Sequence, residues 1–179
     1  MPQWPLRACC QTAEPMSDTI EKPPPAEFSH LAEDGRAVMV DVSGKPVTRR
    51  VAEASCLVRL KSSTVDRLSD LPKGDAWVVA RLAGIQAAKR TAELIPLAHP
   101  LPIDQIEVEL TAVDGGVEIR SRVVTTARTG AELEALVACS NAALGLYDMV
   151  KSVERGAVVT DLRLEAKSGG ASGDYLRGR

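Results

Sequence analysis

The fold is decided by residues 129–151, TGAELEALVACSNAALGLYDMVK. Apolar residues recur here at intervals of three and four, as at Leu133, Leu136 and Tyr147, which is the spacing of a helix with one buried face. Thr129 followed by Glu132 has the pattern of a capping box, so the start of the helix is predicted as well. The stretch therefore predicts one long core helix that carries charged residues at both ends.

Around this helix, alternating apolar and polar residues predict four strands. Residues 54–61 form the first, 106–122 form a hairpin around Asp114-Gly115-Gly116, and 159–166 form the last. A second helix is expected from Asp75 to about Leu94, and its many alanines allow close packing on another element. This order predicts an α+β protein of the ferredoxin-like (split βαβ) class, an antiparallel sheet with the helices packed on one face.

The two ends of the chain differ from this central part. Residues 1–29 contain six prolines and no periodicity, and we expect a disordered N-terminal leader. Residues 30–179 are expected to form a single domain. This domain is expected to start with a polar, irregular segment over residues 30–50 and to end in a flexible Gly/Ser-rich tail.

Composition excludes several classes of function. A net charge of -2 gives no general attraction to nucleic acid, and five aromatic residues are too few for a base-stacking platform. The four cysteines have neither a disulfide framework nor the spacing of metal ligands, so no metal site is expected. No apolar run of membrane-spanning length and no signal-peptide core are found, which favours a cytoplasmic protein with no membrane partner.

Candidate catalytic residues lie at the ends of the long helix. Asp148 has Lys151 one turn away and apolar neighbours in sequence, which suggests a partly enclosed carboxylate with a raised pKa. Glu134 lies on the same stripe of the helix but about 21 Å away along its axis. If both act on one small substrate, either the helix breaks near Gly145 or two chains pack so that opposite helix ends meet.

Other candidates lie in loops. His99 stands in a Pro-bracketed loop and could transfer protons near neutral pH, although a structural histidine is an equal alternative. Arg49 and Arg50 are expected in a loop, where a solvated surface is favoured over a phosphate contact. Lys167 precedes a glycine-rich run, KSGGASG, that could hold an anion, but composition alone favours a frayed tail.

Together these stretches resemble one known family. The segments MVDVSGKPVTRRVA (39–52), KGDAWVVARLAGIQAAKRTAELIPLAHPL (73–101), TGAELEALVACSNAALGLYDMVK (129–151) and LRLEAKSGGASGDY (162–175) are similar to cyclic pyranopterin monophosphate synthase, the molybdenum cofactor biosynthesis protein C. The resemblance implies a ferredoxin-like fold in a hexamer, a trimer of dimers, with active sites between subunits. It implies a lyase that converts (8S)-3',8-cyclo-7,8-dihydroguanosine 5'-triphosphate to cyclic pyranopterin monophosphate and diphosphate.

The resemblance also implies roles for particular residues. Asp148 matches the active-site aspartate, and the other catalytic positions fall on Lys73, His99, Lys151 and Lys167. Substrate-binding positions fall on Leu97, Ala98, His99, Glu132, Leu133 and Glu134, and we add Arg49 and Arg50 as possible triphosphate contacts. Ala98 and Leu133 stand where the family often has Cys and Met, and neither change removes a charge or a proton donor.

An alternative function is a non-catalytic ferredoxin-like module that binds a nucleotide or a pterin as a sensor. Such a module would keep the cations but would have no use for an enclosed aspartate beside a lysine. The sequence requires no cofactor, and it leaves open whether a divalent ion accompanies the triphosphate.

Overall fold

The computed structural model describes residues 35–178, and the leader expected over residues 1–29 lies outside them. The helices and strands of this part of the chain follow in the order β1 (Thr48–Arg59), α1 (Ser62–Val65), α2 (Ala76–Ala88), α3 (Thr91–Leu94), β2 (Ile103–Val113), β3 (Gly116–Ala127), α4 (Glu132–Val150), β4 (Val158–Ser168) and β5 (Tyr175–Leu176).

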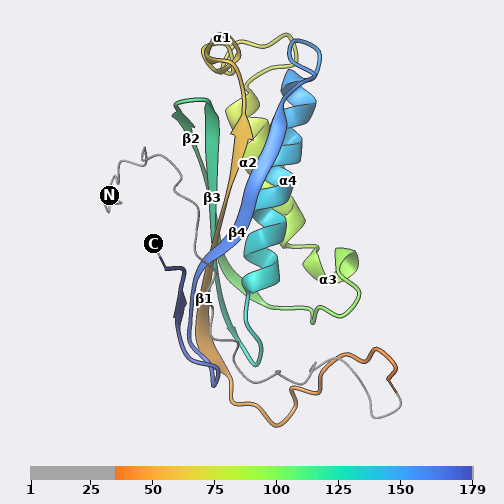
Figure 1. The fold of residues 1–179 in the computed structure, drawn as a ribbon. Helices are drawn as coiled ribbons and strands as arrows, with labels where there is room; N and C mark the ends of the chain where they lie inside the picture. Colours follow the sequence, from red (N-terminus) through yellow and green to blue (C-terminus); the bar gives the residue numbers. More distant parts are fainter. Residues whose placement is uncertain (1–34, 179) are drawn as a thin grey trace.

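The strands form one antiparallel sheet in the order β2-β3-β1-β4-β5. The two long helices, α2 and α4, lie together on one face of this sheet (Figure 1). Apart from the short added edge strand β5, this is the split βαβ arrangement, so the expected ferredoxin-like α+β fold is confirmed.

Helices α2 and α4 pack closely through small residues. A Cβ atom at Gly84 of α2 would come within 2.7 Å of the carbonyl oxygen of Ala138 and 3.0 Å of the Cβ of Ala142, both on α4. Only glycine permits this approach, and the expected close packing of the alanine-rich helix is confirmed. On α4, Ala135 and Leu146 are also completely buried in the core.

Helix α4 is long and apolar enough to cross a membrane, which the sequence reading did not expect. However, 56% of its most apolar window is buried inside the protein. Since most of its apolar residues belong to the buried core, α4 has the character of the core helix of a globular domain.

Two sequence-based boundaries were wrong. The first strand begins at Thr48 rather than Ala54, so Arg49 and Arg50 belong to β1, paired with β3, and not to a loop. The helix from Asp75 ends at Ala88, and a separate turn of helix, α3, follows. The hydroxyl of Thr91 donates to the carbonyl of Ala88. This side-chain hydrogen bond competes with the backbone hydrogen bonds that would continue the helix.

The predicted capping box was also wrong, because α4 begins at Glu132 with Ala131 as its N-cap residue and no side-chain cap. By contrast, Asp75 caps α2 as expected, its carboxylate accepting from the backbone N–H groups of Trp77 and Val78 at 2.8 and 3.2 Å. At the C-terminus, the Gly/Ser-rich stretch that composition assigned to a frayed tail is a turn between the paired strands β4 and β5.

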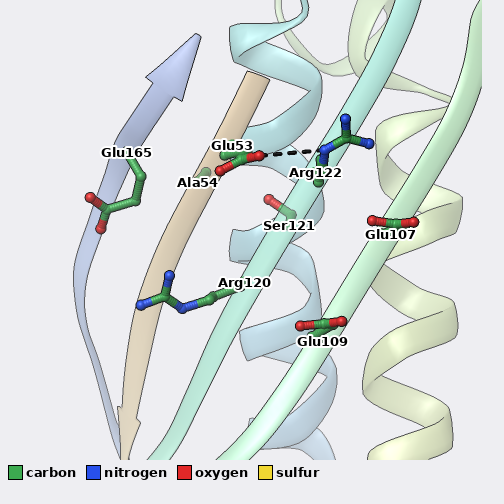
Figure 2. A pocket seen from close by; sticks show the side chains of 8 residues that line it. All are labelled: Glu53, Ala54, Glu107, Glu109, Arg120, Ser121, Arg122 and Glu165. Atoms are coloured by element: carbon green, nitrogen blue, oxygen red, sulfur yellow. Dashed lines mark ion pairs between the residues drawn. The ribbon is translucent and has the colours of Figure 1, made fainter. Parts of the chain in front are cut away.

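The sheet face opposite the helices carries acidic residues and arginines that line a pocket (Figure 2). Arg122 lies directly across from Glu107 in the β2–β3 ladder. Its ion pair, however, is with Glu53 on the other neighbouring strand, β1, at 3.4 Å. Arginines of β3 therefore lie between acidic residues of β2 and β1 on this face (Figure 2).

Candidate active site

The residues predicted for the active site gather at the two ends of α4. This helix is continuous from Glu132 to Val150, so the proposed break near Gly145 does not occur. At its C-terminal end lies the aspartate cluster, which consists of Lys73, Asp148 and Lys151. At its N-terminal end lies the glutamate cleft, defined by its lining residues Val40, Val42, Lys45, Leu97, Ala98, His99, Leu101, Thr129, Gly130, Glu132, Leu133 and Glu134.

In the aspartate cluster, two ammonium groups bind one carboxylate. Lys151 lies 2.6 Å from Oδ1 of Asp148, and Lys73 lies 3.2 Å from Oδ2. Lys73 also donates to the backbone carbonyl of Asp148 at 2.9 Å. This second bond uses a carbonyl group in the last turn of α4, where a cation is favoured. The loop before α2 is thereby attached to the end of α4.

Asp148 is exposed, with 56% of its side chain accessible to solvent. Lys151 and then Lys73 lower the pKa of its carboxyl group below the ordinary value, and they hold it ionised. The expected partial enclosure and raised pKa were therefore wrong. Successive residues on a helix point about 100° apart, so the buried neighbours Met149 and Val150 face the core while Asp148 faces outward.

The glutamate cleft is an open depression between α4, the loop after α3 and the segment before β1. It encloses about 840 Å³ of empty space, which includes space open to solvent. His99 lies half-buried in its wall, and Leu97 and Ala98 precede it there, so all three loop residues expected to bind substrate line one cleft with Leu133.

Glu134 is the buried carboxylate of the cleft, with 3% of the residue exposed. Burial raises the pKa of its carboxyl group to about 7. A hydrogen bond from the backbone N–H of Glu134 itself lowers this pKa, whereas the nearby charge of Glu132 raises it. A carboxyl group with this pKa can both hold and release a proton at neutral pH. The sequence placed Glu134 among the substrate contacts but assigned the raised pKa to Asp148.

Lys167 of β4 forms an ion pair with Glu132, one of the residues that line the cleft. Its ammonium group lies 3.0 Å from Oε1 of Glu132, and it donates to the hydroxyl of Ser172 at 3.2 Å. Glu132 is thus held by a lysine distant in sequence rather than by the local capping box. Through these two contacts, Lys167 connects the first turn of α4 with the glycine turn after β4.

Arg49 and Arg50 are neighbours near the start of β1, and they differ in exposure. Arg49 is exposed, whereas Arg50 is 8% exposed and its guanidinium donates to the carbonyl groups of Ala127 and Arg128. The expected solvated loop was therefore wrong for Arg50, because hydrogen bonds to the end of β3 compensate for its burial.

Sequence reasoning missed Lys45, a cation in the wall of the glutamate cleft. Its position in the segment MVDVSGK was a signal, since this segment is part of the resemblance but was given no site residue. Among residues 35–178, no group of three or more His, Cys, Asp or Glu side chains has an arrangement that could hold a metal ion.

Comparisons with known proteins identify the family to which this arrangement belongs. The model of the MoaC family matches residues 39–170. A relative from Streptomyces griseus, named cyclic pyranopterin monophosphate synthase, is 51% identical over 168 residues, covering 93% of this chain and 95% of its own. Relatives of the same name from a Nocardioides species and from Herpetosiphon aurantiacus are 53% and 50% identical and cover 86% and 83% of this chain and 97% and 93% of their own. The chain belongs to the MoaC family.

Proposed function

We propose that this protein is a cyclic pyranopterin monophosphate synthase, a lyase of molybdenum cofactor biosynthesis. It converts (8S)-3',8-cyclo-7,8-dihydroguanosine 5'-triphosphate to cyclic pyranopterin monophosphate and diphosphate. The observation that carries this proposal is the gathering of lysines and carboxylates from distant segments at the two ends of α4. The names and the near-complete coverage of the relatives support it.

The residues suit the two halves of this reaction. A triphosphate needs cations, and Lys73, Lys151 and Lys167 supply them, with exposed Arg49 as a further contact. Rearranging the guanine-derived ring needs proton transfers, for which Glu134 and His99 are placed in one cleft. Closing the cyclic phosphate is an intramolecular displacement of diphosphate, which positioning and charge neutralisation accelerate.

We further propose that each active site combines the aspartate cluster of one chain with the glutamate cleft of another. The two clusters lie at opposite ends of a continuous 19-residue helix, too far apart for one small substrate. Apolar side chains exposed on the helical layer support contact between copies: Val78, Val79, Leu82 and Leu144. Sites shared between chains fit a hexamer built as a trimer of dimers. We propose that this hexamer works in the cytoplasm.

Incubation of the purified protein with the cyclic dihydroguanosine triphosphate tests the proposed activity. We expect stoichiometric release of diphosphate and formation of a pterin product. A sensor would bind the compound and return it unchanged, and that result would exclude the proposed reaction.

A further inference from the structure

Arg50 lies where two segments of the site meet. Its Nε atom donates to the carbonyl of Ala127 and a terminal nitrogen donates to the carbonyl of Arg128, both at 3.1 Å. These carbonyls belong to the end of β3 and the loop that leads into α4. One guanidinium thus grips two successive peptide units just ahead of Thr129, Gly130 and Glu132, which line the glutamate cleft.

The other side of the same guanidinium faces the glycine turn that follows Lys167. A Cβ atom at Gly170 would lie 2.1 Å from Nη1 of Arg50, so the backbone of the turn packs directly on the guanidinium. Gly170 has a φ of +87°, a conformation that other residues rarely adopt. Arg50 is therefore enclosed between the loop before α4 and the turn after β4.

Within residues 35–178, Arg50 forms no ion pair with a carboxylate. Among the residues that the structure describes, its hydrogen-bond acceptors are the two carbonyl groups. The planar fork of arginine can serve both carbonyls at once, whereas the ammonium group of lysine is a single point charge. This makes the geometry of the side chain, and not its charge alone, the property that the site uses.

We infer that Arg50 is a positioning residue that fixes the loop before α4 against the glycine turn after β4, and so sets the geometry of the Lys167–Glu132 pair. This rests on the proposed function only insofar as that pair is part of the active site. Arg50 would then act on the reaction through Lys167, without touching the triphosphate.

Amide hydrogen exchange of the full-length protein tests the structural part of this inference without any assay of activity. The variants are Arg50→Lys, which keeps the charge and loses the fork, and Gly170→Ala, which disturbs the same contact from the other side. Arg122→Lys is the matched control, because Arg122 lies on neighbouring β3 and pairs with Glu53 on the opposite face of the sheet. We expect amides of residues 128–132 and 168–173 to exchange about tenfold faster in both variants and at the wild-type rate in the control. Unchanged exchange in Arg50→Lys, or equal acceleration throughout the sheet, would overturn the inference.

A double-mutant cycle with Lys167→Ala tests the link to catalysis. We expect Arg50→Lys to lower kcat/KM about tenfold alone and less than about twofold in the Lys167→Ala background, because its effect runs through Lys167. Equal losses in both backgrounds would show that Arg50 acts independently of Lys167, which contradicts the proposed positioning role. If the wild-type protein released no diphosphate, the proposed function would fail, while the exchange rates would still decide whether Arg50 holds the two segments together.

Discussion

The two ends of α4 carry carboxylates in opposite electrostatic states. At the C-terminal end, Asp148 is exposed between two ammonium groups, which lower the pKa of its carboxyl group. At the N-terminal end, Glu134 is buried, and its carboxyl group has a pKa of about 7. One carboxylate is thus permanently charged at neutral pH, and the other can exchange a proton. The contrast suggests that the aspartate cluster organises charge and the glutamate cleft transfers protons.

The largest effect is expected from Asp148→Ala. Removing the carboxylate leaves Lys73 and Lys151 without their shared partner and alters the charge presented to the substrate. We expect diphosphate release to fall by roughly a thousandfold or more, as for loss of a central charged group in an active site. Because Asp148 lies on the surface, the variant should remain folded and should elute with the wild-type oligomer in size-exclusion chromatography. Near-normal turnover would remove Asp148 from the catalytic machinery.

Mixing two inactive variants tests whether the two ends of α4 belong to different sites. Asp148→Ala damages one end and Glu134→Gln damages the other. In a mixed dimer with sites shared between chains, one of the two sites has both ends intact. With random exchange of subunits, half of the dimers are mixed, so activity should return to about a quarter of the wild-type value. Two preparations of Asp148→Ala mixed with each other are the control. If the mixture of different variants stays inactive after subunit exchange, each site lies within one chain.

Glu134→Gln alone should change both activity and the pH dependence of stability. Since Glu134 has a folded-state pKa raised from 4.5 to about 7, its contribution to stability is full below about pH 4.5 and is lost as the pH rises through 7. This loss amounts to roughly 3 kcal/mol for a shift of this size. The glutamine variant carries no charge at any pH, so its Tm relative to wild type should rise between pH 5 and 8.

Turnover of Glu134→Gln should fall about a hundredfold, in the range typical of a lost general acid or base. The wild-type pH–rate profile should also have a limb near pH 7 that is absent from the residual activity of the variant. A matched substitution, Glu109→Gln on the outer face of the sheet, controls for loss of a carboxylate as such. Equal Tm differences at pH 5 and pH 8 would show that Glu134 does not titrate in this range.

The sequence predicted the architecture well because hydrophobic periodicity determines it. Alternation marked the strands, and the spacing of three and four marked α4. The predicted buried face of α4 was wrong in detail: Leu133 is 40% exposed, and the core face is formed mainly by smaller residues such as Ala135 and Ala142. The misplaced details depend on partners distant in the chain. Arg50 is buried because carbonyl groups 77 and 78 residues later accept its hydrogen bonds. Glu132 has its partner in Lys167, which a local capping pattern cannot reveal.

For the candidate site, too, some features could be predicted from the sequence and others could not. Family motifs selected residues that lie at the two ends of α4, but the chemical states of these residues follow from burial. Asp148 was assigned an enclosed environment because its sequence neighbours are apolar, although those neighbours occupy other faces of the helix. Glu134, whose carboxyl group is buried, has equally apolar neighbours in Leu133 and Ala135. Sequence context alone could not distinguish the two carboxylates.

The smallest effect is expected from Lys45→Gln, which removes a cation from the glutamate cleft and leaves the carboxylates of both ends in place. Lys45 is exposed in the segment before β1, so the substitution should leave Tm unchanged. If Lys45 contacts a phosphate group, KM should rise about tenfold with little change in kcat, which corresponds to one charge-assisted hydrogen bond. Lys61→Gln, a lysine outside both clusters, provides the control for loss of a positive charge. A fall in kcat at constant KM would instead place Lys45 in the chemical step, and the glutamate cleft would then combine proton transfer with the charge stabilisation that we assign to the aspartate cluster.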